Sequence, residues 1–263
     1  MGAWFIVLFV LVAVAGIWWS WYSRKKRQEG LALASKQLGM QYAAEDPFGT
    51  MGLPFGLFSK GDGRGLENVM WGAFQGLDVR EFDYWYYEES TDSEGHRHRS
   101  YYRFSCVVTE VPLASAGLTI GREGFFSRFA DSLGFRDIEF ELEEFNREFQ
   151  VKSGDRKFAN DFVDQRMMRW LLGCGDPWSF EVAGPYLMCF CKRLDPAELT
   201  PLLGTLKAFR EQIPRVVYSL YGTGGQAAPQ VPQMPPAPEM PSMPAPPVVP
   251  APGEAPPAPP PPA

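Results

Sequence analysis

Histidine is nearly absent from this sequence: there are two among 263 residues, His96 and His98, and they stand together in one polar segment. A Ser-His-Asp or Cys-His catalytic arrangement would have to use a histidine of that segment. A polar segment of this kind holds catalytic groups poorly in place, so it does not favour a nucleophilic mechanism. The H-x-H pair has donor atoms for zinc, but Arg97 and Arg99 beside it disfavour a cation. We expect no metal site and no catalytic site here, and we predict an exposed loop.

Cysteine is also scarce, with four residues in the chain. Cys189 and Cys191 alternate along an apolar segment, so on a strand both would point to the same face and would be poorly placed to bond to each other. Cys106 and Cys174 lie far from them in the sequence. These spacings argue against a disulfide framework and predict reduced, buried cysteines in a cytosolic domain.

Basic residues are in deficit once the first 28 residues are set aside. From Glu29 to Gly222 there are 21 Lys and Arg against 29 Asp and Glu, a net charge of −8. Nucleic-acid binding needs clustered Lys and Arg to neutralise phosphates, so this composition excludes it. The glycine-rich stretch 47–65 lacks the G-x-x-x-x-G-K-[ST] pattern of nucleotide-binding loops. The stretch is therefore predicted to be a loop, and we expect no cofactor.

The acidic run from Asp137 to Glu144 holds carboxylates of the kind used in acid–base catalysis. Asp137, Glu139 and Glu141 alternate with Ile138 and an aromatic residue, which is the pattern of a solvated strand face. We therefore find no catalytic constellation in the sequence and expect no enzymatic activity.

What the sequence does contain is one long apolar run, residues 3–22, interrupted only by Ser20 near its end. Twenty residues at ~1.5 Å each span ~30 Å, the thickness of the hydrocarbon core of a bilayer. Inside lipid the backbone must satisfy its own hydrogen bonds, so the run predicts one transmembrane helix. The lipid bilayer is thus the first predicted partner.

Aromatic and basic residues mark the ends of this helix. Indole rings prefer the headgroup layer, and Lys and Arg favour the cytoplasmic side and attract anionic lipids. The predicted membrane-anchor residues are Trp4 at one end and Trp18, Trp19, Trp21, Tyr22, Arg24, Lys25, Lys26 and Arg27 at the other. No Lys or Arg precedes the helix. We therefore predict a single-pass protein of the cell membrane, with its N-terminus outside and its folded domain in the cytosol.

The alternative is a cleaved signal peptide, which would leave the folded domain outside the cytoplasm. A signal peptide has a basic n-region and a shorter apolar core, and neither is present. Ala13, Ala15 and Gly16 are nevertheless small residues of the kind found at cleavage sites. They keep the extracytoplasmic alternative open.

The rest of the chain divides into three regions. A basic juxtamembrane segment and helix cover 23–39, a folded domain covers 40–222, and a tail covers 223–263. In the helix, Leu31, Ala34 and Leu38 share one face, and Gly39 predicts its C-terminal end. Within the domain we expect an aromatic-rich hairpin over 68–87, a polar loop over 88–98 and a long strand over 101–111. The first hairpin is expected to turn at Gln75 and Gly76. Further strands are expected over 118–121, 138–141 and 145–151, with a hairpin over 179–191 that turns at Ala183–Pro185. Helices are expected over 125–133, over 164–172 with Asp164 as the N-cap, and over 195–213. Strands joined as hairpins outnumber helices, which predicts an α+β fold: an antiparallel sheet with a few packed helices.

The tail, 223–263, holds 17 of the 25 prolines, two charged residues and no aromatic residue. It cannot form a core, so it predicts a disordered segment with polyproline II character. Proline-rich segments are ligands for aromatic grooves. A protein partner bound through this tail and a spacer without a partner both remain open.

The domain also resembles a known family. The residues on which the resemblance depends are the F-N-R-x-F-x-V motif of Phe145 to Val151, together with Leu57 to Gly63, Phe82 to Tyr84, Asp155, Phe158, Ala159 and Met167 to Leu172. Over Leu31 to Tyr221 they are similar to single-span, largely actinobacterial membrane proteins that carry a domain of unknown function. The resemblance implies a membrane-anchored domain and brings no activity, cofactor or site residue with it.

Two functions fit these observations. The first is a membrane-tethered cytosolic interaction or scaffold module, suggested by the single span, the tail and the missing catalytic residues. The alternative is a lipid or small hydrophobic ligand-binding domain at the membrane surface, suggested by the aromatic residues of Phe82 to Tyr87.

Overall fold

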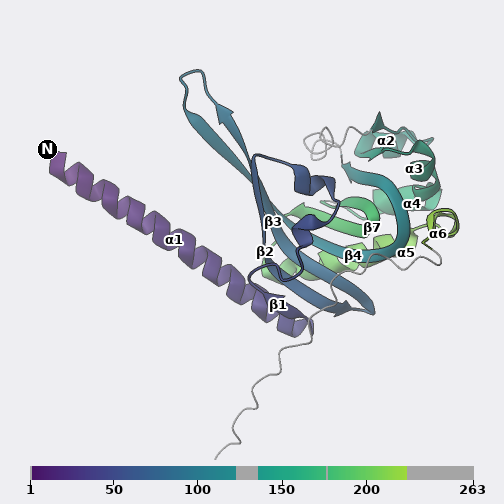
Figure 1. The fold of residues 1–263 in the computed structure, drawn as a ribbon, viewed down its shortest axis with the longest axis horizontal. Helices are drawn as coiled ribbons and strands as arrows, with labels where there is room; N and C mark the ends of the chain where they lie inside the picture. Colours follow the sequence, from purple (N-terminus) through teal and green to yellow (C-terminus); the bar gives the residue numbers. More distant parts are fainter. Residues whose placement is uncertain (1, 123–135, 176, 224–263) are drawn as a thin grey trace, which may run out of the picture. The chain divides into compact units, whose positions relative to one another are not determined.

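The computed structural model describes residues 2–122, 136–175 and 177–223 (Figure 1). The chain divides into two units, Met1–Gln230 and Val231–Ala263. The predicted tail lies outside the described residues apart from Thr223, and so does the helix predicted over 125–133.

The domain in the first unit is built on a seven-stranded antiparallel sheet. The strands run in the order β1-β2-β3-β4-β6-β5, and β7 pairs with β4 as well. Their bounds are β1 (Gln41–Ala43), β2 (Gly63–Phe74), β3 (Leu77–Thr91), β4 (Arg97–Arg122), β5 (Arg136–Asp137), β6 (Phe149–Ser153) and β7 (Ser179–Lys192). The predicted α+β fold with an antiparallel sheet is confirmed.

A long N-terminal helix and several short ones complete the described fold. The α-helices are α1 (Gly2–Gln37), α2 (Glu143–Glu148), α3 (Arg156–Phe162), α4 (Gln165–Gly173), α5 (Leu199–Gln212) and α6 (Arg215–Tyr221), and the 3-10 turns are η1 (Thr50–Gly52), η2 (Gly56–Ser59) and η4 (Pro196–Glu198). The predicted N-cap of α4 is confirmed, because the Asp164 carboxylate accepts a hydrogen bond from the Met167 backbone N–H at 2.8 Å. The last predicted helix begins as the turn η4, and α5 itself starts at Leu199.

The hairpin expected around Gln75 and Gly76 is present, but the polar loop expected over 88–98 is wrong. Strands β3 and β4 continue to Thr91 and from Arg97, with Glu88 paired to Ser100. The turn between them is short because the Asp92 carboxylate accepts hydrogen bonds from the backbone N–H groups of two turn residues, at 2.9 and 2.8 Å. Polar sequence here belongs to a two-stranded arm that projects from the sheet (Figure 1).

The hairpin expected over 179–191 is also wrong, because β7 runs through it as one strand beside β4. The pairs Glu110↔Tyr186 and Leu118↔Val182 flank a register shift at Gly184, whose φ of 56° lies in the left-handed region. The turn signal Ala183–Pro185 thus produces a bulge shared by two long strands rather than a reversal of direction. The strand predicted over 118–121 is likewise the continuation of β4.

The segment 145–151 was expected to be extended throughout, and its first half is helical instead. Phe145 lies in α2 and Phe149 begins β6. Their rings stack with centroids 5.2 Å apart, one helical turn from each other. Apolar residues spaced by four fit a helix, and the alternation Phe149-x-Val151 alone belongs to a strand. Ile138 to Glu141 lies outside the described strands.

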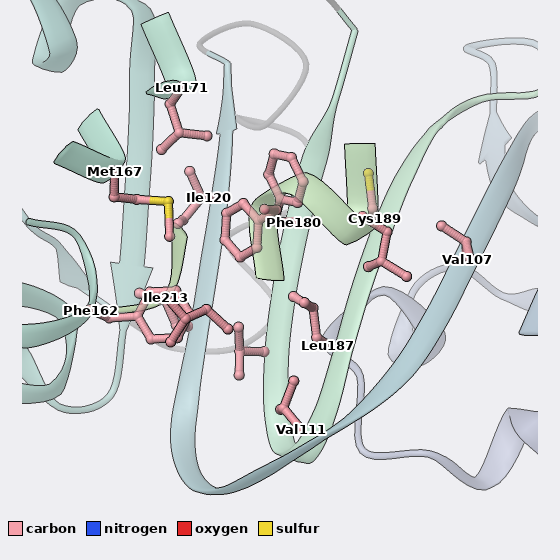
Figure 2. Packing of buried hydrophobic residues seen from close by; sticks show 14 of the residues in the cluster. Val107, Val111, Ile120, Phe162, Met167, Leu171, Phe180, Leu187, Cys189 and Ile213 are labelled. Atoms are coloured by element: carbon pink, nitrogen blue, oxygen red, sulfur yellow. The ribbon is translucent and has the colours of Figure 1, made fainter. Parts of the chain in front are cut away.

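Apolar clusters lie on both faces of the sheet. Val107 belongs to the larger cluster and Val108 to the smaller one, and neighbours on a strand point to opposite faces. In the larger cluster Phe162 of α3 and Met167 of α4 share one core with Phe180 of β7 (Figure 2). The segment that contains η1 and η2 covers the smaller cluster, which includes Phe82, Tyr84 and Phe104. The aromatic strand β3 is therefore covered on both sides along much of its length.

Candidate functional site

Helix α1 runs without a break from its exposed N-terminal half into the domain. From Val7 onward it is long and apolar enough to cross a membrane, and that apolar window has no residue buried within the protein. Trp4 and Tyr22 lie eighteen residues apart, ~27 Å along a helix. A signal sequence shares this length and composition.

The C-terminal end of α1 is part of the core. Leu31 is fully buried and Ala34 nearly so, as predicted from their shared face, and Gly39 ends the helix with a φ of 68°. A Cβ atom on Gly30 would lie 3.0 Å from the Pro196 ring, so α1 and η4 are in close contact. The helix is thus packed against the domain rather than joined to it by a linker.

The four basic residues after the apolar run do not share one environment. Arg24 and Lys26 are exposed, and the Nζ atom of Lys25 lies 5.3 Å from the centroid of the Trp21 ring. Arg27 differs from them, because its side chain is only 12% exposed and faces the sheet. It was expected to attract lipid headgroups, but the structure gives its guanidinium group a protein partner.

That partner is Asp83 of β3. The Nε and NH2 groups of Arg27 donate hydrogen bonds of 2.6 and 2.5 Å to the two carboxylate oxygens, and NH1 donates one of 2.8 Å to the Leu194 carbonyl. Asp83 also accepts a bond of 2.9 Å from the Asn68 side-chain amide, whose oxygen accepts one of 2.9 Å from the Tyr42 hydroxyl. A paired and hydrogen-bonded charge network of this kind joins α1 to β1, β2 and β3.

Asn68 reaches Asp83 because the strand is irregular at this point. The register of β2 shifts between Glu67 and Met70, and Asn68 adopts a left-handed backbone with a φ of 60°. Asparagine tolerates that conformation better than most residues. Burial raises the pKa of Tyr42 to about 12, with the charge of Asp83 acting in the same direction, so the hydroxyl stays protonated and donates.

Glu81 lies one step along β3 on the same face and is fully buried. Burial raises its pKa well above the usual value, the charge of Asp83 adds to this rise, and Arg27 opposes it. In the described part of the chain neither of its carboxyl oxygens has a hydrogen-bond partner. The buried acid therefore favours its neutral form behind the Arg27–Asp83 pair.

A pocket of about 480 Å³ opens beside this network, between α1 and the sheet. We call it the helix–sheet pocket. It is lined by Trp19, Ser20, Ser23, Arg24, Arg27, Gln28, Glu67, Asn68, Trp85, Tyr101, Arg103 and Arg193. Four of these residues are arginines, one is acidic and three are aromatic, so the pocket is basic even though the domain carries net negative charge.

Two glycines of β2 lie opposite aromatic residues of β3, one of which, Trp85, lines the pocket. In the register of β2 and β3, Gly65 pairs with Trp85 and Gly63 with Tyr87. A Cβ atom at Gly65 would lie 2.6 Å from the Trp85 ring, and one at Gly63 would lie 2.3 Å from the Tyr87 ring. The rings therefore lie across the strand where side chains are missing. The loop predicted for the Gly-rich stretch to position 65 is wrong at its end, because strand β2 begins at Gly63.

Arg103 and Arg193 form the basic wall opposite α1. The backbone N–H of Arg193 donates to the Arg103 carbonyl at 3.1 Å, which brings the two residues together where β7 ends. Burial lowers the pKa of Arg193, and the charges of Arg27 and Arg103 also lower it, while Asp83 and Glu67 act in the opposite direction. Positive charge in this corner is thus only partly neutralised by the protein.

The other residues singled out in the sequence lie elsewhere. His96 and His98 are exposed on the arm, where His96 Nδ1 lies 3.3 Å from Asp92. Among the described residues no group of three or more His, Cys, Asp or Glu is arranged to hold a metal ion. Cys106, Cys189 and Cys191 are buried, as expected, whereas Cys174 is half-buried.

The F-N-R-x-F-x-V motif has a structural role in this domain. Phe145, Phe149 and Val151 are buried in the larger cluster. The Asn146 amide accepts from the Phe140 N–H at 2.9 Å and donates to the Phe140 carbonyl at 2.7 Å. The motif therefore holds the α2–β6 corner together and lies apart from the helix–sheet pocket.

Together these features define an antiparallel α+β domain mounted on one long apolar helix, with a basic and aromatic pocket at their junction. No family model matches the sequence, so the family resemblance stays a prediction, and no curated protein matches it either. Among solved structures, the fold is similar to the crystal structure of the mycobacterial trehalose monomycolate transport factor A, TtfA. The two share 14% sequence identity and a TM-score of 0.50 over 70% of this chain and 93% of that one. At this identity the likeness shows a common fold.

Proposed function

We propose that this protein is a membrane-anchored lipid-binding factor whose helix–sheet pocket receives a lipid headgroup. In this proposal α1 remains in the bilayer, and the domain stands on the cytosolic side and binds without catalysing a reaction. The observation that carries the proposal is the pocket, because one of its walls is the membrane helix itself.

The level of the pocket along α1 supports a headgroup as its occupant. Trp19, Ser20 and Ser23 line it, and they lie where the apolar run ends. This is the level at which indole rings and basic side chains meet the polar part of a bilayer. A lipid in the surrounding leaflet would reach the pocket by lateral movement, without leaving the membrane.

The fold comparison supports a role in lipid handling. The similar solved structure is that of a trehalose monomycolate transport factor. The present chain shares its fold at 14% identity. We therefore infer a lipid as the ligand class and leave the choice of lipid to the chemistry of the pocket.

Retention of α1 is supported by the exposed apolar residues that follow its small residues Ala13, Ala15 and Gly16. Cleavage after Ala15 would cut the helix in its apolar part and leave Ile17 to Tyr22 as a new, exposed apolar N-terminus. A reporter fused after Gly222 tests the orientation. We expect a reporter that is active in the cytosol to work and one that needs export to fail, and the reverse result would overturn the proposed topology.

Lipid binding is tested by filling the pocket. The Ser23→Trp variant of the full-length protein places a large ring in it, whereas Lys25→Trp adds the same ring about 200° around the helix at a position that does not line the pocket. Native mass spectrometry in detergent should detect copurifying lipid on the wild type and on Lys25→Trp but not on Ser23→Trp. Absence of lipid from all three proteins would contradict the proposal.

The projecting arm favours a second function, that of a membrane-tethered interaction module. Pairing of β2 with β3 ends at Tyr87, and pairing of β4 with β7 ends at Phe104. Beyond these points Glu88–Thr91 and Arg97–Ser100 pair only with each other among the described strands, so both edges of the arm are open. An open strand edge is a template on which a partner can add a strand.

This second function is tested by shortening the arm. Glu88 and Ser100 are paired, so an Asn-Gly turn in place of residues 89–99 closes the hairpin with matched geometry. Pull-downs from detergent extract would compare the full-length protein, this variant and a chain ended at Gly222. Loss of a partner from the shortened arm alone assigns binding to the arm, and loss from the chain ended at Gly222 assigns it to the tail.

A further inference from the structure

The helix–sheet pocket carries more positive charge than its own acidic residue and the Arg27–Asp83 pair neutralise. Of its four arginines only Arg27 is held by Asp83, in a geometry that engages both carboxylate oxygens. Arg24 and Arg193 are exposed, as is Arg103, whose Cζ atom lies 5.5 Å from the Tyr101 ring centroid. Among the described residues that line the pocket, Glu67 alone is acidic. Three guanidinium groups therefore face the same space as one carboxylate.

Guanidinium groups are suited to phosphate oxygens. Their planar donors match two oxygens of a phosphate at once, and they are less strongly hydrated than an ammonium group, so they bind in partly buried sites. Arg193 is placed by its backbone bond to Arg103, which lies on strand β4 rather than on a loop. The donors are thus held close together before any ligand arrives.

The rest of the pocket suits the part of a lipid that adjoins the phosphate. Trp19 from the helix and Trp85 from the sheet form amphipathic walls. A second hollow on α1 shares Ser20 and Arg24 with the pocket and continues toward the apolar end along Ala13, Gly16, Ile17 and Trp21. A headgroup in the pocket would therefore have an apolar path beside it for an acyl chain.

We propose that the helix–sheet pocket selects a lipid with a phosphate in its headgroup, bound by Arg103 and Arg193 with Arg24 at the membrane side. This inference rests on the proposed lipid-binding function and adds the ligand class to it. It predicts a preference for an anionic phospholipid over an uncharged glycolipid with the same acyl chains.

The test uses the full-length protein in detergent with equal amounts of phosphatidylglycerol and glucosyl-diacylglycerol of matched chains, read by native mass spectrometry. The wild type should retain phosphatidylglycerol at least tenfold over the glycolipid. The Arg103→Gln/Arg193→Gln variant should lose this preference. Arg147→Gln/Arg215→Gln, which removes the same charge from exposed positions outside the pocket, should keep it.

The outcomes separate the inference from the function on which it rests. Retention of both lipids without preference, or an unchanged preference in Arg103→Gln/Arg193→Gln, overturns the phosphate assignment and leaves lipid binding in place. Retention of neither lipid by the wild type overturns the proposed function itself. Inorganic phosphate added in tenfold excess over lipid should not displace phosphatidylglycerol, and displacement would reassign the pocket to a soluble phosphate compound.

Discussion

Arg27 and Asp83 lie 56 residues apart in the sequence and form a two-point ion pair that joins helix α1 to strand β3 of the sheet. Both side chains are largely buried, with 12% and 3% of their surfaces exposed. Arg27 lines the helix–sheet pocket, and its bonds to Asp83 fix the position of α1 against β3. The geometry of the proposed lipid site therefore depends on this contact.

Removing one partner of the pair should be costly. In Arg27→Ala the Asp83 carboxylate stays buried without its cation, and losing half of a buried pair typically destabilises a protein by about 3–5 kcal/mol. Urea unfolding of the full-length protein in detergent, followed by circular dichroism, measures this loss. The neighbouring Lys26→Ala is the control, because Lys26 is exposed and its replacement should change stability by less than ~0.5 kcal/mol.

The paired replacement Arg27→Leu/Asp83→Leu distinguishes a charge effect from a packing effect. Replacing both partners by apolar residues removes the unpaired charge, so the double variant should be more stable than Arg27→Ala. A double variant as unstable as the single one would contradict this account, because it would show that lost packing, and not the orphaned Asp83, causes the destabilisation.

A second prediction concerns Gly65, the glycine beneath the Trp85 ring. In Gly65→Ala the added Cβ atom would lie 2.6 Å from the indole ring, so the ring must leave its place and one wall of the pocket is lost. We expect reduced lipid retention in native mass spectrometry with the fold preserved, as judged by circular dichroism. Gly204→Ala in α5 is the matched control, because nothing lies within 4 Å of its added Cβ atom.

Gly204→Ala should also raise stability, by about 0.5–1 kcal/mol, since alanine favours a helix interior over glycine. Its lipid retention should equal that of the wild type. If both glycine variants lose lipid equally, the loss does not come from the displacement of Trp85.

Local signals in the sequence predicted much of this fold. The apolar run, Gly39 as a helix stop and Asp164 as a helix cap each depend on neighbouring residues, and each was found. One error arose where a local signal was overruled by a distant strand. The turn signal around Gly184 becomes a bulge because β4 bends beside it, over more than 60 residues of sequence separation.

The pocket was harder to predict than the fold. Its walls come from α1, β2, β3, β4 and the residue after β7, and no motif joins these segments in the sequence. One partial signal was available, because Gly63 and Gly65 alternate in the strand that pairs with the aromatic residues of β3. Their exact partners were not predictable, since the register shift between Glu67 and Met70 sets the pairs Gly65↔Trp85 and Gly63↔Tyr87. No signal in the sequence identified Asp83 as the partner of Arg27, because Asp83 is one of many acidic residues. Only the packing of α1 against the sheet brings the two side chains together.

A buried carboxyl group on the other face of the sheet predicts a pH dependence. Glu181 is 4% exposed, and it accepts hydrogen bonds from the Gly56 N–H and, at 3.3 Å, from the Leu57 N–H, so it ties η2 to β7. Burial raises its pKa to about 7, against a usual value of 4.5. Between pH 4.5 and about 7 the carboxyl group of Glu181 is therefore protonated in the folded state and ionised in the unfolded chain.

The sign of the effect follows from this difference in protons bound. The contribution of Glu181 to stability is fully present below about pH 4.5 and is lost as the pH rises toward 7, at about 1.4 kcal/mol for each pH unit between the two pKa values. In Glu181→Gln this loss is absent. From pH 5 to pH 8 the unfolding free energy of the variant should therefore gain about 2–3 kcal/mol relative to the wild type, measured in urea at both pH values. Because all other titrating groups are common to the two proteins, a difference that does not change with pH would mean that Glu181 ionises in the folded state as it does in the unfolded chain.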